Sequence, residues 1–209
     1  MWMRGGTSKG LYFLKNDIPT DIEKRRDFLL SVFGSPDTLQ INGIGGGNPL
    51  TSKVAIVSKS KRPNIDVDYL FLQVAVDKYV VSSQQNCGNI LAGIAPFALE
   101  RGLIKPEKNK TTIRIFMENS KQVAVSTVET PNRNLTYEGY TYIDGVTLPG
   151  APISLEFLDI EGSLCGQLLP SGNLKDEVDG YSLTMIDNGM PCVITVSYTH
   201  LTLPTTPYL

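Results

Sequence analysis

A short polar stretch, Asn86-Cys87-Gly88-Asn89, leads directly into an apolar run that extends from Ile90 to Leu103. This pattern predicts that Cys87 lies at or just before the N-terminus of a helix, and Gly102 is a normal signal for the end of that helix. Because the run is apolar on nearly every side, we expect the helix to be buried at the centre of the fold. The rest of the chain must then supply the structure that surrounds it.

Cys87 is the first candidate for chemistry. Backbone N–H groups at a helix N-terminus stabilise a thiolate and bind the oxygen atoms of a carboxylate. The flanking Asn86, Gly88 and Asn89 favour a site where a ligand comes close to the backbone. The alternative is that Cys87 only fills space in the core, as free cysteines usually do.

The composition, with 41% hydrophobic and 19% charged residues in a chain of 209, is typical of a globular protein. A formal net charge of -2 gives no general attraction to nucleic acid or to an anionic membrane, so we expect neither as a partner. The N-terminus carries no apolar signal segment, and no run approaches the roughly 18 apolar residues that span a bilayer. We therefore predict a cytoplasmic protein.

Three cysteines and one histidine limit the possible chemistry. Cys87, Cys165 and Cys192 lack the paired spacing of a zinc site or a disulfide framework, and we expect Cys165 and Cys192 to pack in the core or within strands. His200 lies in the segment 196–209, which changes character abruptly and resembles a translated sequencing adapter. We predict that this tail is not native. The folded body then has no histidine for Cys/His or Ser/His pairs or for a histidine-ligated metal.

The glycine-rich segment from Met3 to Gly10 carries Arg4, Thr7 and Ser8 within a few residues. It is not a P-loop, because that motif requires Lys and Ser or Thr after the last glycine and this chain continues with Leu11. The density of donors favours an oxyanion-binding loop over a tight turn that needs glycine for backbone reasons alone.

A second glycine-rich segment, residues 40–48, ends close to Thr51, Ser52 and Lys53, where a strand is expected to begin. A loop so rich in glycine loses much entropy on ordering, which argues against a purely structural role. The junction of a loop with a strand aims side chains into a site from a rigid base. These three residues are candidates, although Lys53 is equally compatible with a surface position at a strand end.

Periodicity predicts the secondary structure. A helix is expected from Ile22 to Phe33, opened by the capping box Thr20-Asp21-Ile22-Glu23. Segments that are β-branched, aromatic or alternating predict strands at 11–14, 54–57, 69–76, 79–81, 111–117, 122–128, 135–143, 153–158, 181–186 and 192–195. Many strands around one apolar helix indicate an α+β fold.

Six motifs, in the expected order, closely resemble the PrpF family, which comprises aconitate isomerase-like and 4-oxalomesaconate tautomerase-like proteins of the diaminopimelate-epimerase fold. They are Met3-Arg4-Gly5-Gly6-Thr7-Ser8-Lys9-Gly10, Gly34-Ser35-Pro36-Asp37, Leu50-Thr51-Ser52-Lys53-Val54-Ala55-Ile56-Val57, Asp66-Val67-Asp68-Tyr69, Asn86-Cys87-Gly88-Asn89 and Asp187-Asn188-Gly189-Met190-Pro191.

This resemblance implies two pseudo-symmetric lobes, each a curved and mostly antiparallel β-sheet around a central helix, with the active site in the cleft between them. We predict an N-terminal lobe over residues 1–180, the first strands of a second lobe over 181–195, and the non-native tail over 196–209. Family members run to nearly twice this length. The chain is therefore interpreted as a fragment, and activity is expected of the complete family fold rather than of this chain alone.

The resemblance also implies a function. Members of the family act without metal or organic cofactor and shift a proton along an unsaturated di- or tricarboxylate such as (methyl)aconitate or 4-oxalomesaconate. It assigns catalysis to Lys53 and Cys87, and contact with a small polycarboxylate substrate to Arg4, Thr7, Ser8, Thr51, Ser52, Asn86, Gly88 and Asn89. It further suggests a homodimer and a functional partnership with an aconitase-like dehydratase.

Two other functions stay open at this point. The first keeps the fold and uses two facing cysteines to epimerise or racemise an amino acid, but such enzymes lack the lysine at position 53 and the loop from Arg4 to Gly10. The second is a non-catalytic protein that binds carboxylates or assists a dehydratase.

Overall fold

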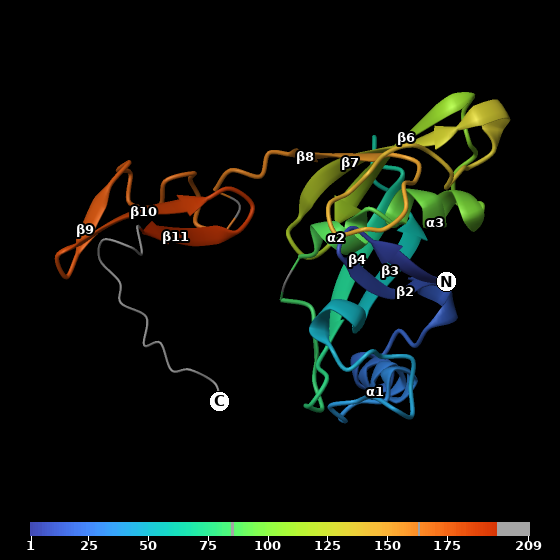
Figure 1. Ribbon diagram of the computed structural model, residues 1–209, viewed down its shortest axis with the longest axis horizontal. Coiled ribbons are helices and arrows are strands. Elements are labelled where there is room, and N and C mark those ends of the chain that lie inside the picture. Colours follow the sequence, from blue (N-terminus) through green and yellow to red (C-terminus); the bar gives the residue numbers. More distant parts are fainter. Residues whose placement is uncertain (85, 163, 196–209) are drawn as a thin grey trace. The chain divides into compact units, whose positions relative to one another are not determined.

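A computed structural model describes residues 1–84, 86–162 and 164–195 (Figure 1). The chain separates into two compact units, Met1–Leu158 and a second unit that begins at Asp159. This division lies earlier in the chain than the predicted lobe boundary at residue 180, and the assignment of the lobes stays a prediction. The predicted tail, with His200, lies outside the described residues. Within the described ranges, no helix is long and apolar enough to cross a membrane.

The first unit is built on an eight-stranded sheet of order β1-β2-β3-β4-β6-β7-β8, with β5 paired to β4. The pairs β2–β3 and β4–β6 are parallel and the other pairs are antiparallel, which confirms the expected mostly antiparallel arrangement. The strands are β1 (Trp2–Gly5), β2 (Ser8–Leu14), β3 (Lys53–Lys59), β4 (Val67–Val74), β5 (Val81–Ser82), β6 (Asn109–Met117), β7 (Gln122–Thr130) and β8 (Ile153–Leu158).

Helix α1 (Ile22–Phe33) covers one face of this sheet and forms as predicted. Its N-cap is Asp21, whose carboxylate accepts a hydrogen bond from Lys24 N at 2.9 Å, and Gly34 ends it in the left-handed conformation. The apolar side of α1 packs with alternate residues of the strands. This cluster contains Leu11, Ile18, Leu29, Leu30, Phe33, Val54, Ile56, Leu72 and Val74.

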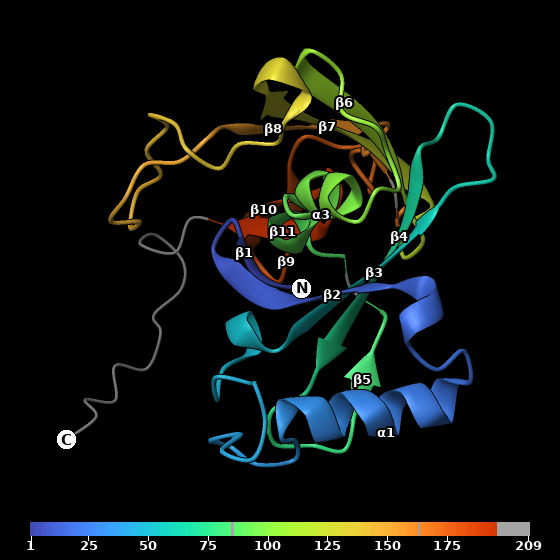
Figure 2. The ribbon, with the colours of Figure 1, turned by 90° about the vertical axis from the view of Figure 1, so that its right-hand side faces the viewer.

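The opposite face of the sheet curves around two short helices, α2 (Gly88–Leu91) and α3 (Ile94–Glu100) (Figure 2). The predicted continuous helix is therefore wrong in one respect, because it is broken at Ala92 and Gly93. A Cβ atom on Gly93 would overlap the hydroxyl of Tyr12, so the chain turns where the sheet comes closest. The predicted end is confirmed: Gly102 adopts φ +68° after α3.

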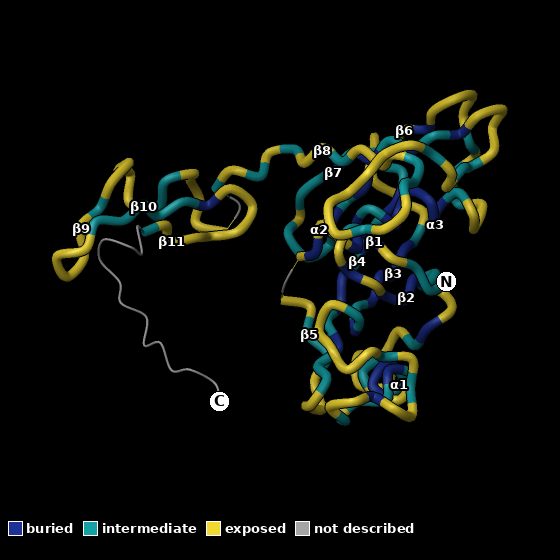
Figure 3. Tube along the Cα trace, viewed as in Figure 1, coloured by how far each residue is buried: buried dark blue, intermediate teal, exposed yellow. Residues whose placement is uncertain are grey.

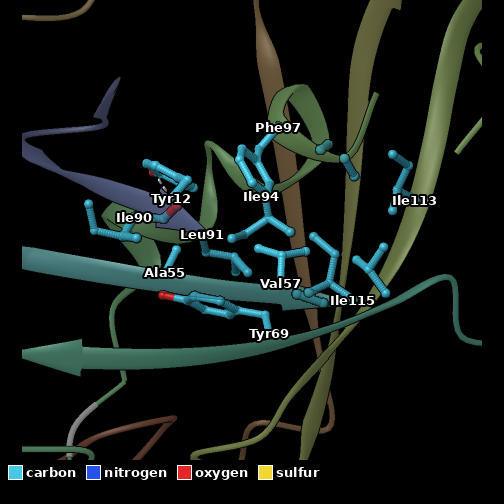
Figure 4. Packing of buried hydrophobic residues seen from close by; sticks show 14 of the residues in the cluster. Tyr12, Ala55, Val57, Tyr69, Ile90, Leu91, Ile94, Phe97, Ile113 and Ile115 are labelled. Carbon is cyan, nitrogen blue, oxygen red and sulfur yellow. Dashed lines mark hydrogen bonds between the residues drawn. The ribbon is translucent and has the colours of Figure 1, made fainter. Parts of the chain in front are cut away.

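The core between the helices and the sheet is the larger of the two apolar clusters (Figures 3 and 4). This cluster contains alternate residues of β3 and β4, namely those on the face of the sheet that points away from α1. Successive side chains of a strand point to opposite faces, so this alternation is expected. Its members include Tyr12, Ala55, Val57, Tyr69, Phe71, Ile90, Leu91, Ile94, Phe97, Ile113 and Ile115.

The strand predicted at 135–143 is wrong. After β7 the chain forms a short 3-10 turn, η3 (Pro131–Arg133), and then a loop whose ladder contact is the single bridge between Thr141 and Gly150. Strand β7 is already paired on both sides, by β6 and β8, so the strand that precedes this segment offers it no edge. The aromatic residues that alternate in this segment are exposed instead, and Tyr140 is 94% exposed.

The second unit contains a small antiparallel sheet of order β11-β10-β9, formed by β9 (Asp176–Val178), β10 (Tyr181–Asp187) and β11 (Pro191–Thr195). Asp187 is buried, and its carboxylate accepts hydrogen bonds from Leu164 N and Cys165 N, both at 2.7 Å. Cys192 lies within strand β11, as expected, although it is exposed, whereas Cys165 is exposed outside any strand, so the expectation is wrong for Cys165. A sheet of three short strands has too little apolar surface to bury them.

Candidate functional site

Lys53 and Cys87 meet at one end of the first unit. Lys53 is the first residue of β3, and Cys87 is the N-cap of α2. Lys53 Nζ donates a hydrogen bond to Cys87 Sγ at 3.5 Å, and the same nitrogen lies 5.2 Å from the centroid of the Phe71 ring. The Cys87 residue is only 7% exposed. The structure thus brings together the two residues that the sequence singled out for catalysis.

Lys53 faces the thiol because of its place in the sheet. Lys53, Ala55 and Val57 alternate along β3 and point to the same side, and Ala55 and Val57 belong to the cluster that contains Cys87. Gly10 lies opposite Lys53 in the parallel register of β2 and β3, where a Cβ atom would overlap the Lys53 carbonyl oxygen. Glycine at this position therefore allows the two strands to pair closely beneath the site.

Two buried tyrosines hold α2 on the sheet. The hydroxyl of Tyr12 donates to the carbonyl oxygen of Ile90 at 2.7 Å (Figure 4). The hydroxyl of Tyr69 donates to the carbonyl oxygen of Cys87 at 3.5 Å. Burial, and after it the charge of the nearby Cys87, raises the pKa of both phenols above the usual range. Both therefore remain protonated donors at neutral pH.

The segment before Cys87 is tied to the turn between β6 and β7. The side-chain oxygen of Asn86 accepts from Cys87 N at 3.0 Å, and its nitrogen donates to Ser120 Oγ at 3.2 Å. Asn119 accepts from Phe71 N at 2.8 Å and donates to the carbonyl oxygens of Phe71 and Ser83 at 3.0 and 2.8 Å. Asn86 thus shapes the turn before Cys87. Asn119 also holds this segment in place, and the sequence did not identify it.

The first glycine-rich loop lies against Asn89. The side-chain oxygen of Asn89 accepts from Thr7 N at 3.3 Å, and a Cβ atom on Gly5 or Gly6 would overlap Asn89. The guanidinium of Arg4 is exposed and donates to the carbonyl oxygen of Gly6 at 2.8 Å. The loop and the Asn86–Asn89 stretch therefore lie against each other at Asn89.

Ser8 is 2% exposed, and its hydroxyl has no hydrogen-bond partner among the residues that the structure describes. It points to the same side of β2 as Tyr12, because side chains four residues apart on a strand share a face. A buried hydroxyl without a partner costs free energy and is rare in folded proteins.

Ser52 and Thr51 do not point into this surface. Ser52 is fully buried, and its hydroxyl bonds with the Gln40 side-chain oxygen at 2.9 Å and the Asn48 carbonyl oxygen at 3.0 Å. Thr51 Oγ1 donates to the same Asn48 carbonyl oxygen at 3.0 Å. Both hydroxyls are committed to the loop that precedes Lys53. Gln40 was not recognised from the sequence, since nothing local distinguishes it.

A cavity of about 670 Å³ adjoins the Gly88–Asn89 backbone. Arg4 and Gly6 form part of its wall, and most other lining side chains are apolar, among them Leu135, Ile143, Leu148 and Leu155. Neither Lys53 nor Cys87 lines it. In the described part of the chain, no group of three or more histidine, cysteine, aspartate or glutamate side chains is placed to hold a metal ion.

Comparison with known proteins gives consistent matches. A family model described as "PrpF protein" matches residues 1–203. The chain is 62% identical over 194 residues to the (4E)-oxalomesaconate Delta-isomerase of Novosphingobium sp., covering 93% of this chain and 54% of that protein. It is 55% identical over 192 residues to the 4-oxalomesaconate tautomerase of Pseudomonas putida, covering 92% of this chain and 53% of that protein.

Among solved structures, a methylitaconate-delta-isomerase superposes with a TM-score of 0.84 at 38% identity, covering 95% of this chain and 52% of that one. This match confirms the predicted α+β, epimerase-like fold. The chain spans about half the length of the curated relatives it matches. Since the family model extends over nearly the whole sequence and the identity to relatives is this high, the chain belongs to the PrpF family.

Proposed function

We propose that the protein is a cofactor-independent isomerase that shifts a proton along an unsaturated polycarboxylate. One observation carries this proposal: the ammonium of Lys53 lies 3.5 Å from the sulfur of Cys87 at the surface formed by the Asn86–Asn89 stretch and the first glycine-rich loop. An acid and a base in contact are what a 1,3-proton shift requires, because one proton must leave a carbon and another must be added two carbons away.

The hydrogen bond from Lys53 to Cys87 suggests the roles. We assign the Cys87 thiolate as the base that removes a proton from the carbon next to the double bond. The Lys53 ammonium then donates a proton to the far carbon of the allylic unit. After these two steps Cys87 is a neutral thiol and Lys53 is a neutral amine. Transfer of the thiol proton to the amine restores the starting state. Because the two groups are adjacent, both reach the substrate from the same face.

The intermediate between these steps is an extended enolate, whose negative charge must be stabilised. Ser8 offers a buried hydroxyl that is not otherwise used, and Arg4 offers an exposed guanidinium next to Asn89. The N–H groups at the start of α2 have no intrahelical acceptors, which suits them to a carboxylate. We therefore propose that Arg4, Thr7, Ser8, Gly88 and Asn89 hold the carboxylates.

The names of the relatives suggest the substrate. The two relatives described above are named for oxalomesaconate, and the solved structure is named for methylitaconate. These are unsaturated polycarboxylates, so we propose that class, with 4-oxalomesaconate as the first compound to test. From the family alone we also propose a cytoplasmic location, a homodimer and an aconitase-like dehydratase as a functional partner.

The test is proton exchange in deuterated water. A full-length protein, in which residues 1–195 are continued by the second lobe, is incubated with 4-oxalomesaconate, and deuterium in the recovered acid is measured by proton NMR and mass spectrometry. We expect deuterium at the carbons of the allylic unit, with loss of exchange in Cys87→Ser and unchanged exchange in Cys165→Ser. Binding without exchange would favour the non-catalytic carboxylate-binding protein. Amino acids are incubated in the same way, and exchange at an α-carbon would favour the epimerase.

A further inference from the structure

We propose that Gln40 is a positioning residue that sets the place of Lys53 relative to Cys87. This inference rests on the proposed function, because it assigns a role to a residue through the Lys53–Cys87 pair. Gln40 is 13 residues from Lys53 in the sequence. Its side-chain amide nevertheless lies where three segments of the chain converge on the start of β3.

The side chain of Gln40 makes three hydrogen bonds although the residue is only 1% exposed. Its nitrogen donates to Ser35 Oγ at 3.0 Å. Its oxygen accepts from Gly47 N and from Ser52 Oγ, each at 2.9 Å. The amide therefore connects the turn after α1, the second glycine-rich loop and the residue immediately before Lys53.

The bond to Ser52 reaches Lys53 through a single peptide unit. Ser52 is also fixed from its other side, because its carbonyl oxygen accepts from Gln73 Nε2 at 2.9 Å and from Val74 N at 3.0 Å. With both its hydroxyl and its carbonyl held, Ser52 fixes the backbone from which β3 and the side chain of Lys53 begin. Loss of the Gln40 bond leaves the Ser52 hydroxyl with the Asn48 carbonyl oxygen, at 3.0 Å, as its remaining partner among the described residues.

The glycines of the second loop fit the same interpretation. A Cβ atom on Gly45 would overlap the amide of Gln40, so the backbone packs directly on this side chain. Gln40 itself has a positive φ of 50°, an uncommon conformation for a residue with a side chain. The glycine content of this loop argued against a purely structural role, whereas the structure shows its backbone packed on a buried amide.

The test measures the alkylation rate of Cys87 by iodoacetamide at pH 7, resolved from Cys165 and Cys192 by peptide mass spectrometry in the same sample. The thiolate is the nucleophile and an adjacent ammonium stabilises it, so the rate reports the distance between Lys53 and Cys87. The variants are Gln40→Met, which keeps the length of the side chain but removes its hydrogen bonds, and Gln40→Glu, which keeps the acceptor oxygen. Gln167→Met is the control, since its amide donates to the Pro170 carbonyl oxygen at 3.2 Å within the second unit.

We expect Gln40→Met to slow Cys87 alkylation roughly tenfold, towards the rate of Lys53→Met, and to move the pH–rate profile to higher pH. Gln40→Glu should stay closer to the parent rate, and Gln167→Met should equal it. Alkylation of the exposed Cys165 and Cys192 should not change in any variant. A purely structural role for Gln40 would lower the unfolding midpoint without moving the pH–rate profile.

The outcomes separate the two proposals. If Lys53→Met slows Cys87 but Gln40→Met leaves both the rate and the profile at the parent values, Gln40 does not position the lysine. If Lys53→Met itself has no effect on Cys87, the reactive pair and the function built on it are overturned. Should Gln40→Met fail to fold, Ser52→Ala removes the same bond from the other side, and a parent-like Cys87 rate in that variant overturns the inference.

Discussion

The ammonium of Lys53 and the sulfur of Cys87 lie 3.5 Å apart although they are 34 residues apart in the chain. One belongs to the end of a central strand and the other to the cap of a short helix, so neither depends on a mobile loop for its direction. The near-complete burial of Cys87 limits screening by water, which strengthens the attraction between a thiolate and an ammonium. In the proposed mechanism Lys53 contributes in two ways: its charge stabilises the Cys87 thiolate, and its proton is donated to the substrate. Substitution can distinguish the two contributions.

Lys53→Arg keeps the positive charge but removes a group that can release a proton at neutral pH. We expect turnover to fall by about a hundredfold or more, the usual contribution of a general acid, while Cys87 alkylation stays within about twofold of the parent. Steady-state kinetics and thiol labelling check this. Lys59→Arg, at the exposed opposite end of β3, is the matched control and should leave both quantities unchanged. Parent-like turnover in Lys53→Arg would remove the lysine as the acid.

Gly93→Ala tests the close contact between the helices and the sheet. The added methyl group would overlap the Tyr12 hydroxyl, so we expect a loss of about 1–3 kcal/mol in the free energy of unfolding, measured with urea. Gly150→Ala is the control, because its Cβ would meet no atom nearer than Tyr137 O at 3.5 Å, an ordinary contact. Equal stability of the two variants would contradict the tight packing at Gly93.

Local patterns in the sequence predicted local structure well. The cap at Asp21 and the left-handed glycine at Gly34 set the bounds of α1, and Gly102 does the same for the end of α3. The position of Cys87 as the N-cap residue also follows from its neighbours alone. Each of these features depends on a few consecutive residues, which is why single-sequence reasoning reaches them.

Features that depend on distant contacts were not predicted. At the break between α2 and α3, Gly93 packs directly against Tyr12, about eighty residues earlier in the chain, and the amide of Gln40 acquires its role only when three segments meet. The segment 135–143 alternates like a strand, but the preceding strand, β7, is paired with β6 and β8 and offers it no edge. Alternation describes what a segment could do, whereas pairing depends on which partners remain.

Asn119→Asp tests how the Cys87 segment is held. An aspartate of the same shape still accepts from Phe71 N, but it cannot donate to the carbonyl oxygens of Phe71 and Ser83. We expect a loss of about 1–3 kcal/mol in unfolding free energy, because two acceptors lose their donor and face a carboxylate. Asn134→Asp, which gives up one exposed bond to Asn132, should change stability far less. Urea denaturation measures the unfolding free energy of both variants, and equal losses would contradict the role given to the Asn119 amide.

The buried phenols predict how stability depends on pH. The pKa of Tyr12 and of Tyr69 is raised in the folded protein, first by burial and then by the charge of Cys87, whereas an unfolded tyrosine ionises near pH 10. Above that pH the unfolded chain releases protons that the folded protein retains, so the free energy of unfolding falls as pH rises, by up to about 1.4 kcal/mol per pH unit for each phenol.

Tyr12→Phe removes one of these groups and the bond to the Ile90 carbonyl oxygen. We expect it to be less stable than the parent at pH 8, by about 1 kcal/mol for the lost hydrogen bond, but to lose stability less steeply between pH 9 and 11. Tyr140→Phe, at a residue that is 94% exposed, should follow the parent curve throughout. Urea denaturation at closely spaced pH values measures both slopes. Parallel curves for Tyr12→Phe and the parent would show that the Tyr12 phenol ionises as readily in the folded protein as in the unfolded chain, contrary to its enclosure between β2 and α2.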